Sequence, residues 1–474
     1  MKSSIFIFFL LSTSVFAQRV LTLDEAIKIG LGESFTIKSA DYSLESSLKN
    51  LEAVKLGLRS SVNLEFDIPS YNRSLSSQFN PALGSEQFYK VETTRLESRL
   101  FVNQPLVFSN GTVSLVGSLF GRKQNSELSG NLEDFYTNLS VQLRQPLFTF
   151  NNQKANLERA EINLTKSERN YSQAERDLIY EVSANFYNLL KAKKSVEITK
   201  EKVAQTDTSF QTAMNKFRAG LIAEVEALQL EVDLAASQNE LLNAERSFQE
   251  AKNNFKLLIG LPLNEDIDVE GDIEYVDVVV DKDNALKNAL EKRPDLLNRE
   301  DDIYLSELSI EETDAYSSIR AELTANYGIN KNDDMFKNLF NNFDDNRSVV
   351  MTVSIPVFDW GRNAREVESA EADYKLTLLR YENLKERIEN EIIEAIGRLN
   401  SAKARVEVLS KSVLVAEKSY SISLERFRAG TITSFDLTQM QLKLTDAKLN
   451  SLSALIDYRV ALADLERKTF RKYN

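Results

Sequence analysis

Two stretches of the chain combine great length with apolar residues at helical spacing. From Asn151 to Phe217 there is no glycine or proline, and apolar residues recur with a helical period, as at Phe186 and Leu190. A helix of this length would extend about 100 Å, because each residue adds about 1.5 Å. The stretch 361–427 repeats the pattern and is interrupted only by Gly397. The sequence therefore predicts two helices far longer than those of an ordinary globular domain.

Shorter helical segments accompany each long one. In the first half they cover Phe35–Leu58 and about 39 residues after Gly220. In the second half they cover 294–319 and 431–470. In each half the two short segments together nearly equal the long helix, so we expect them to stack end to end beside it.

Between the helical segments, apolar residues alternate with polar ones. A period of two over about eight to ten residues is typical of a strand with one apolar face, and of strands in a transmembrane β-barrel. Four segments show it, with apolar positions at Val62, Leu64, Phe66 and Ile68; Leu139, Val141 and Leu143; Ala321, Leu323, Ala325 and Tyr327; and Val349, Met351, Val353 and Ile355.

The connection between the first two alternating segments is unusually long. It contains two further candidate strands, near Leu96–Val102 and Thr112–Phe120. The letters NQPLVFSNG at 103–111 are similar to RQPLFTFNN at 144–152, as if this hairpin also turned at the inner rim of a barrel. Six strands per chain would then be present. We expect instead four barrel strands per chain and a long extracellular insertion at about 69–137.

The chain contains an internal duplication. The tetrapeptide FRAG occurs at 217–220 and 427–430, and the segments that precede these sites align without a gap, with about 18 of 75 pairs identical. Equal length suits helices packed side by side, because an insertion would shift every later contact. We therefore divide the mature chain into repeats at 18–270 and 271–474, the second with barrel strands at about 320–355.

Each FRAG marks the tip of a helical hairpin, at 217–226 and 427–436. Gly220 and Gly430 follow the long helices, where glycine adopts the left-handed conformation that caps the last carbonyls. Thr433 and Asp436 have the spacing of a capping box at the start of the returning helix. A plain helix stop without further function explains the tetrapeptide equally well.

The composition excludes several common classes of catalytic site. The chain has no histidine and no cysteine, which excludes thiolate nucleophiles, histidine acid–base catalysis and Cys/His zinc sites. Its net charge of -13 argues against a nucleic-acid partner. Acidic pairs such as Asp333–Asp334 lack the spacing of a calcium-binding loop. We expect no enzyme activity, no cofactor and no metal site.

The first 17 residues have the pattern of a signal peptide. Lys2 precedes an apolar run over Ile5–Leu11, and Val15 and Ala17 occupy the -3 and -1 positions of a cleavage site. An exported chain without a later run of about 18 apolar residues can enter a membrane only as a β-barrel. Four strands are too few to close a barrel, since the smallest have about eight, so the chain must oligomerise.

Aromatic residues follow the prolines Pro146 and Pro356 that end two of the strands. Tryptophan and tyrosine are enriched at membrane–water interfaces, and we place these rings there. The alternative is a strand–helix junction in a soluble protein. The residues are Phe148, Phe150, Phe358 and Trp360.

With these features the chain resembles the TolC-like outer membrane efflux protein (outer membrane factor) family. The resemblance is carried by the tip segments FRAGLIAEVEALQLEVDLAASQNELLNAE and FRAGTITSFDLTQMQLKLTDAKLNSLSAL, by the opening LTLDEAIKIGL, and by the junctions QPLF and IPVF. It covers essentially the whole mature chain, and the long first connection is the main departure.

The resemblance implies a mixed α and membrane β-barrel fold. A homotrimer would form a 12-stranded barrel in the outer membrane of a Gram-negative-type cell, continued through the periplasm by an α-helical barrel. It implies a passive exit duct of a tripartite efflux or type I secretion system. The partners would be outer-membrane lipid, a periplasmic adaptor (membrane fusion) protein and an inner-membrane pump of the RND, ABC or MFS class. The cargo is left open.

In this family the hairpin tips form a constricted entrance ringed by carboxylates. By position, these are Glu226 and Asp436 here. Acids in the first turn of a helix also complement its dipole, which is a purely structural alternative. The residues that would dock the adaptor are Ala219, Gly220, Leu221, Ala429, Gly430 and Thr431.

The tips also depart from the family pattern. A tyrosine and an arginine that hold the closed state in well-described members correspond to Phe427 and Ile432, and a further acid corresponds to Gln439. The closed state must therefore be held differently or be weaker. Arg218 and Arg428 are candidates to pair with the tip acids.

Two other functions compete with the duct. A periplasmic coiled-coil scaffold without channel activity would explain the long helices but not the amphipathic strands. A standalone porin would explain the strands but not the helices.

Overall fold

The computed structural model describes residues 19–271, 273 and 275–473. The expected signal peptide at 1–17 lies outside the described residues. The chain divides into two units. The first contains the chain up to Leu44 together with Glu168–Asn298 and Tyr381–Asn474, and the second contains Glu45–Ser167 and Arg299–Arg380.

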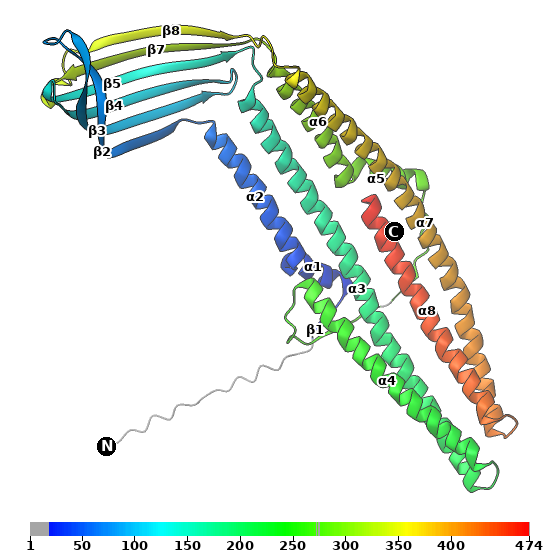
Figure 1. The fold of residues 1–474 in the computed structure, drawn as a ribbon. Coiled ribbons are helices and arrows are strands. Elements are labelled where there is room, and N and C mark those ends of the chain that lie inside the picture. The colour runs from blue at the N-terminus through cyan, green and yellow to red at the C-terminus, as the bar shows by residue number, and fades with distance from the viewer. Residues whose placement is uncertain (1–18, 272, 274, 474) are drawn as a thin grey trace, which may run out of the picture. The chain divides into compact units, whose positions relative to one another are not determined.

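The chain forms two helical hairpins of equal size, and all but the first part of each long helix belongs to the first unit (Figure 1). The long helices α3 (Asn152–Arg218) and α7 (Arg362–Arg428) have 67 residues each. The returning helices α4 (Glu224–Ile259) and α8 (Ser434–Thr469) have 36 each. The long helices begin within two residues of their predicted starts. None of the helices in the described part of the chain is long and apolar enough to cross a membrane.

Shorter helices precede each hairpin in the same order. They are α1 (Leu23–Glu33) and α2 (Phe35–Gly57) in the first half, and α5 (Lys282–Lys292) and α6 (Pro294–Ala315) in the second. The order of helices thus repeats in the two halves, as the internal duplication predicts. A short parallel pair joins β1 (Arg19–Leu21) to β6 (Ile267–Val269).

Gly260 fixes the place where α4 meets the break between α1 and α2. Its φ of 80° is left-handed, and a Cβ there would stand 2.4 Å from the carbonyl oxygen of Glu33. Only glycine therefore allows the end of α4 to approach this closely. The neighbouring core buries Phe186, Phe255 and Ile259 completely or almost completely.

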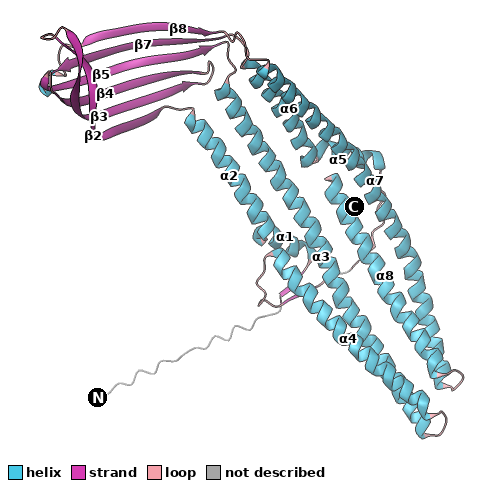
Figure 2. Cartoon of the chain, viewed as in Figure 1, coloured by secondary structure: helices cyan, strands magenta, loops and turns pink. Residues whose placement is uncertain are grey.

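The second unit contains an antiparallel sheet of six strands in the order β2-β3-β4-β5-β7-β8 (Figure 2). Every neighbouring pair is antiparallel. The strands are β2 (Ser61–Asn80), β3 (Ser85–Leu106), β4 (Gly111–Ser126), β5 (Gly130–Leu147), β7 (Arg320–Asp333) and β8 (Asp344–Ser354).

The expectation of four strands with an insertion at 69–137 was wrong. That segment holds the whole of β3 and β4, and β4 is hydrogen-bonded along its length to β3 and β5. The apolar alternation of these strands is weak because Ser98, Gly117 and Gly121 fall at apolar positions. Backbone ladders form regardless of such interruptions. The pattern indicated two candidate strands in this segment but not that they pair with β2 and β5.

The register places apolar residues of successive strands on the same face. Val62, Val102, Leu115, Val141 and Tyr327 lie in one row across β2, β3, β4, β5 and β7. Because side chains alternate between faces, the other predicted apolar positions of β2, β5 and β7 lie on this face too. We call it the apolar face.

Ion pairs occupy the opposite face. Arg99 lies 3.4 Å from Glu65, 3.2 Å from Asp67 and 3.2 Å from Glu97. Arg122 of β4 pairs with Asp134 of β5 at 2.8 Å. The sheet is therefore charged on one side and apolar on the other.

Candidate functional site

Both hairpins turn through the predicted glycines. Gly220 has φ 71° and Gly430 has φ 76°, and no atom would meet a Cβ at either position within 4 Å. Backbone conformation therefore selects glycine here, rather than lack of space. The bond from Leu221 N to Lys216 O, 2.9 Å, and the bond from Thr431 N to Arg426 O, 2.9 Å, close both helix ends.

The two tips pack against each other within one chain. Ala227, Leu230, Phe427 and Leu437 are almost fully buried in a shared apolar cluster. Farther from the turns, buried Gln441 of α8 donates to the carbonyl oxygen of Lys202 at 3.0 Å and to Thr206 Oγ1 at 2.7 Å on α3. These contacts join the first hairpin to the second.

Lys216 makes the polar contact between the tips that lies closest to the turns. Its Nζ donates a hydrogen bond to the carbonyl oxygen of Phe427 and stands 4.4 Å from the centre of the Phe427 ring. Sequence reasoning missed this lysine because its partner is a backbone oxygen 211 residues away. The only sequence signal was its place immediately before FRAG.

The two tip acids hold equivalent positions but have different partners. Each is the third residue of its helix. Asp436 accepts hydrogen bonds from Thr433 N at 3.1 Å and Thr433 Oγ1 at 2.8 Å, which completes the predicted capping box. These bonds lower the pKa of Asp436 below its usual value. The N-cap of α4 is Ala223, which makes no side-chain hydrogen bond, so Glu226 has no reciprocal cap.

Glu226 instead lines a cavity of about 500 Å³ between the tips, together with Lys216, Phe427 and Arg428. The expected pairing of the tip arginines with the acids is not found for Arg428. It pairs with Glu425 one turn earlier, at 2.9 Å. The remaining predicted tip residues are Arg218, exposed at the end of α3, and Gln439, half-buried on α8.

All six predicted docking residues are exposed on the turns. Leu221 is the largest of them, and 72% of it is accessible to solvent. An exposed leucine beside an apolar cluster is suited to contact another protein.

The predicted interface aromatics lie at the strand–helix junctions of the second unit. Phe148, Phe358 and Trp360 are strongly exposed, whereas Phe150 borders a small cavity of about 190 Å³. The Phe358 and Trp360 rings lie 4.8 Å apart. Phe148 and Trp360 have positive φ angles of 57° and 62°, so the backbone at both junctions holds an unfavourable conformation that exposes a ring.

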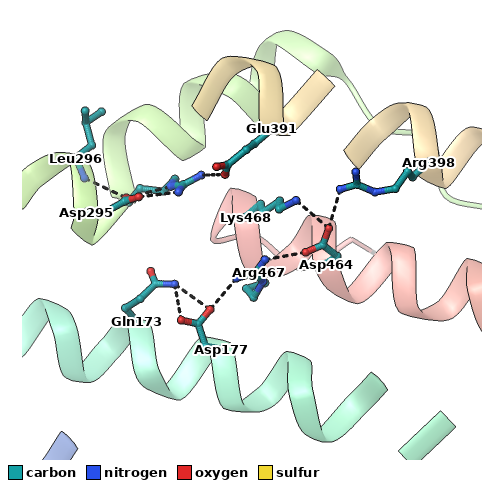
Figure 3. Close-up of polar contacts among 10 residues, drawn as sticks. Gln173, Asp177, Asp295, Leu296, Glu391, Arg398, Asp464, Arg467 and Lys468 are labelled. Carbon is teal, nitrogen blue, oxygen red and sulfur yellow. Dashed lines mark hydrogen bonds and ion pairs between the residues drawn. The ribbon is translucent and has the colours of Figure 1, made fainter. Parts of the chain in front are cut away.

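A charge cluster ties three long helices together in the first unit (Figure 3). Asp464 of α8 lies 3.1 Å from Arg398 of α7 and 3.0 Å from Lys468. It also accepts from Arg467 at 2.9 Å, and Arg467 reaches Asp177 of α3 at 2.9 Å. Burial would raise the pKa of Asp464, but the hydrogen bonds and charges of Arg467 and Lys468 outweigh it and lower that pKa. Sequence reasoning did not identify this cluster.

A second group of charges joins α5, α6 and α7. Arg293 bonds to Asp295 at 2.6 Å and to Glu391 at 2.8 Å. Burial opposes the charge of Arg293, but these two acids raise its pKa overall. Among the described residues, no group of three or more acidic side chains is arranged to hold a metal ion.

The fold matches solved structures over almost its whole length. A membrane protein from Pseudomonas aeruginosa superposes with a TM-score of 0.72 and 16% identity, over 94% of this chain and 92% of that one. The outer membrane protein VceC of Vibrio cholerae gives 0.70 and 15%, over 95% and 97%. The open state of the MtrE outer membrane channel of Neisseria gonorrhoeae gives 0.67 and 17%, over 95% and 89%.

Sequence comparison gives a family but no curated relative. No curated protein matches the chain. The family model described as outer membrane efflux protein matches residues 114–261 and 285–469, which is well over half of the chain. The chain therefore belongs to the outer membrane efflux protein family, and the protein lies in the outer membrane and extends into the periplasm.

Proposed function

We propose that three copies of this chain form a passive exit duct that a periplasmic adaptor connects to an inner-membrane pump. The pump would be of the RND, ABC or MFS class, and the cargo would be a small molecule or a protein secreted by the type I route. Energy would come from the pump, because the sequence contains no phosphate-binding loop or nucleotide-binding fingerprint.

The observation that carries this proposal is the pair of equal hairpins whose tips pack together. Each has a long arm of 67 residues and a returning arm of 36. Three copies would bring six such tips to one end of an α-helical barrel. The acids Glu226 and Asp436 would then surround the entrance, where crowded like charges attract cations and favour opening.

The second unit supports insertion into a bilayer. Along β5, the apolar face lies between Phe135, which stacks edge-on against Phe336 at 5.7 Å, and Phe148. About 13 residues at about 3.3 Å each, tilted by about 40° as in barrels, span about 30 Å. This distance agrees with the thickness of the hydrocarbon core. The aromatics at both ends would mark the two interfaces.

Deletion of the gene tests the duct directly. Cells without the protein should retain more of a fluorescent dye or antibiotic than the parent strain, and re-expression should restore extrusion. Secreted proteins in the medium are measured in the same strains to detect a type I cargo. Unchanged retention of every tested compound, with unchanged secretion, would contradict the proposed function.

A further inference from the structure

We infer that the hairpin β3–β4 is part of the barrel wall, and that β8 of one copy pairs with β2 of the next. This inference rests on the proposed trimer. Three copies of six strands would close an eighteen-stranded barrel rather than the twelve-stranded barrel expected from the family.

The two edges of the sheet need partners. β2 and β8 each have one neighbour in the sheet, and every residue of β8 is exposed. The predicted apolar positions of both strands, including Val62, Leu64, Val349 and Met351, are more than half exposed. Free backbone N–H and C=O groups are very costly inside a bilayer, so strands there occur only in closed barrels.

The direction of the strands permits closure by a second copy. Successive strands of the sheet alternate in direction across all five ladders. With an even number of strands, the first and last run in opposite directions. Pairing of β8 with β2 of the next chain is therefore antiparallel, like every other ladder in the sheet.

The apolar pattern and the strand ends together set the register that we propose for this seam. When Ser61, which begins β2, is placed opposite Ser354, which ends β8, Val62 faces Val353 and Leu64 faces Met351. Both pairs then lie on the apolar face. A slip by one residue would place apolar side chains against the charged face. A slip by two residues would leave the strand ends unaligned.

The hairpin β3–β4 has one apolar and one charged face, as a strand pair in a barrel wall does. Its residues Val102 and Leu115 lie in the apolar row between Val62 of β2 and Val141 of β5. On the other face, its arginines Arg99 and Arg122 form ion pairs with β2 and β5. Because barrel diameter grows roughly linearly with strand number, the wall would be about half again as wide as with twelve strands.

Cysteine labelling tests whether β4 is part of the barrel wall. The chain has no native cysteine, so each introduced thiol is unique. Ser114→Cys and Ser118→Cys lie on the charged face, and Leu115→Cys and Leu119→Cys on the apolar face. In isolated outer membranes, a membrane-impermeant maleimide should label the first two at least tenfold faster. Ser129→Cys in the β4–β5 turn controls for reagent access. Equal labelling of both faces, or of neither while Ser129→Cys reacts, overturns the inference.

A cysteine pair tests the seam. In the proposed register Asn63 and Thr352 of neighbouring chains face each other on the charged side. The double variant Asn63→Cys with Thr352→Cys should form disulfide-linked trimers on oxidation, whereas Leu64→Cys with Thr352→Cys, whose thiols point to opposite faces, should not. Equal cross-linking by both pairs, or by neither, would overturn the register.

Imaging of the detergent-extracted trimer then counts the strands. Eighteen strands would confirm the wall, and twelve would overturn it. Dye extrusion, measured with the labelling variants, distinguishes failure of this inference from failure of the proposed function. A twelve-stranded barrel in a protein that still extrudes dye would refute this inference alone, whereas loss of extrusion with eighteen strands would refute only the proposed function.

Discussion

We expect Lys216 to contribute more than any other residue to holding the two hairpin tips in their closed arrangement. Where the family resemblance implies a tyrosine and an arginine that hold the closed state, this chain has Phe427 and Ile432. The structure provides a different contact, from the Lys216 ammonium to the carbonyl oxygen and ring of Phe427. A charged donor on a backbone oxygen contributes about 1.5–3 kcal/mol. We therefore expect Lys216 to hold the two hairpins of one chain together.

Lys216→Met should open the entrance. Loss of about 1.5–3 kcal/mol shifts the ratio of open to closed tips by about ten- to a hundredfold. Single-channel conductance of the purified protein in planar bilayers should rise accordingly. Lys194→Met is the control and should leave the conductance unchanged, because Lys194 is an exposed lysine of α3 whose ion pair, with Glu197 at 2.8 Å, lies within the same helix. Equal conductance of the two variants would show that Lys216 does not hold the tips.

Asp464 should matter more for stability than an exposed acid in a similar ion pair. Its side chain is 13% exposed and contacts three cations, whereas Asp457, paired with Arg405 at 3.0 Å, is 48% exposed. Asp464→Asn should lower the free energy of unfolding by about 1–3 kcal/mol, because the partly buried cations of Arg467 and Lys468 lose a charged partner. Asp457→Asn should cost about 0–1 kcal/mol. Thermal unfolding followed by helical circular dichroism distinguishes these outcomes, and equal midpoints would contradict the prediction.

The same carboxylate predicts a dependence on pH. Because the folded pKa of Asp464 lies below its usual value of 3.8, its contribution is fully present above that value. It is lost as the pH falls through the lowered pKa. The difference in unfolding midpoint between the parent and Asp464→Asn should therefore shrink below about pH 4. A difference that stays constant down to pH 2 would mean that the ionised carboxylate is not the stabilising species.

At the scale of elements, the two returning helices begin differently. α8 has a complete capping box, whereas α4 has Ala223 where α8 has Thr433. Ala223→Ser would complete the box with Glu226 and should stabilise the first tip by about 0.5–1 kcal/mol. Thr433→Ala should destabilise the second tip by about 0.5–2 kcal/mol. Amide hydrogen exchange at the two turns should slow in the first variant and accelerate in the second, and no change in either would refute the capping argument.

Glu226→Gln tests whether Glu226 acts at the entrance. A carboxylate that accepts capping hydrogen bonds keeps its charge, as at Asp436, so only a variant that removes the charge separates the two roles. If the Glu226 carboxylate attracts cations to the entrance, the cation selectivity of the channel should fall. Unchanged selectivity would favour a purely structural role for this acid.

The elements that local patterns specify were predictable from sequence, and those that depend on distant contacts were not. The absence of glycine and proline over 151–217 predicted α3, and Thr433 with Asp436 predicted the start of α8. β3 and β4 were recognised as candidate strands but assigned to an insertion, because the pattern of a strand does not show whether it pairs with β2 and β5. Lys216 and the Asp464 cluster were missed because their partners lie on other helices, where one sequence shows no pairing.

At the scale of the whole molecule, the exposed tips predict which substitutions prevent binding of the proposed adaptor. Leu221→Arg should abolish or strongly reduce dye extrusion without changing the thermal unfolding midpoint, because a charge would replace the apolar contact that we propose for the adaptor. Leu242→Arg is the matched control, since Leu242 is similarly exposed (66%, against 72% for Leu221) on α4 but far from the turn in sequence. Equal loss of extrusion in both variants would place the docking surface elsewhere.

The matched helix lengths limit how such a protein changes in evolution. α3 and α7 are equal, as are α4 and α8, and the tips at their ends contact each other. A single inserted residue in one arm would rotate its later side chains by about 100° and move one tip away from the other. A lineage whose cell envelope becomes deeper must therefore lengthen four arms together. Tolerated insertions should occur in whole turns, and as correlated events in both halves of the gene.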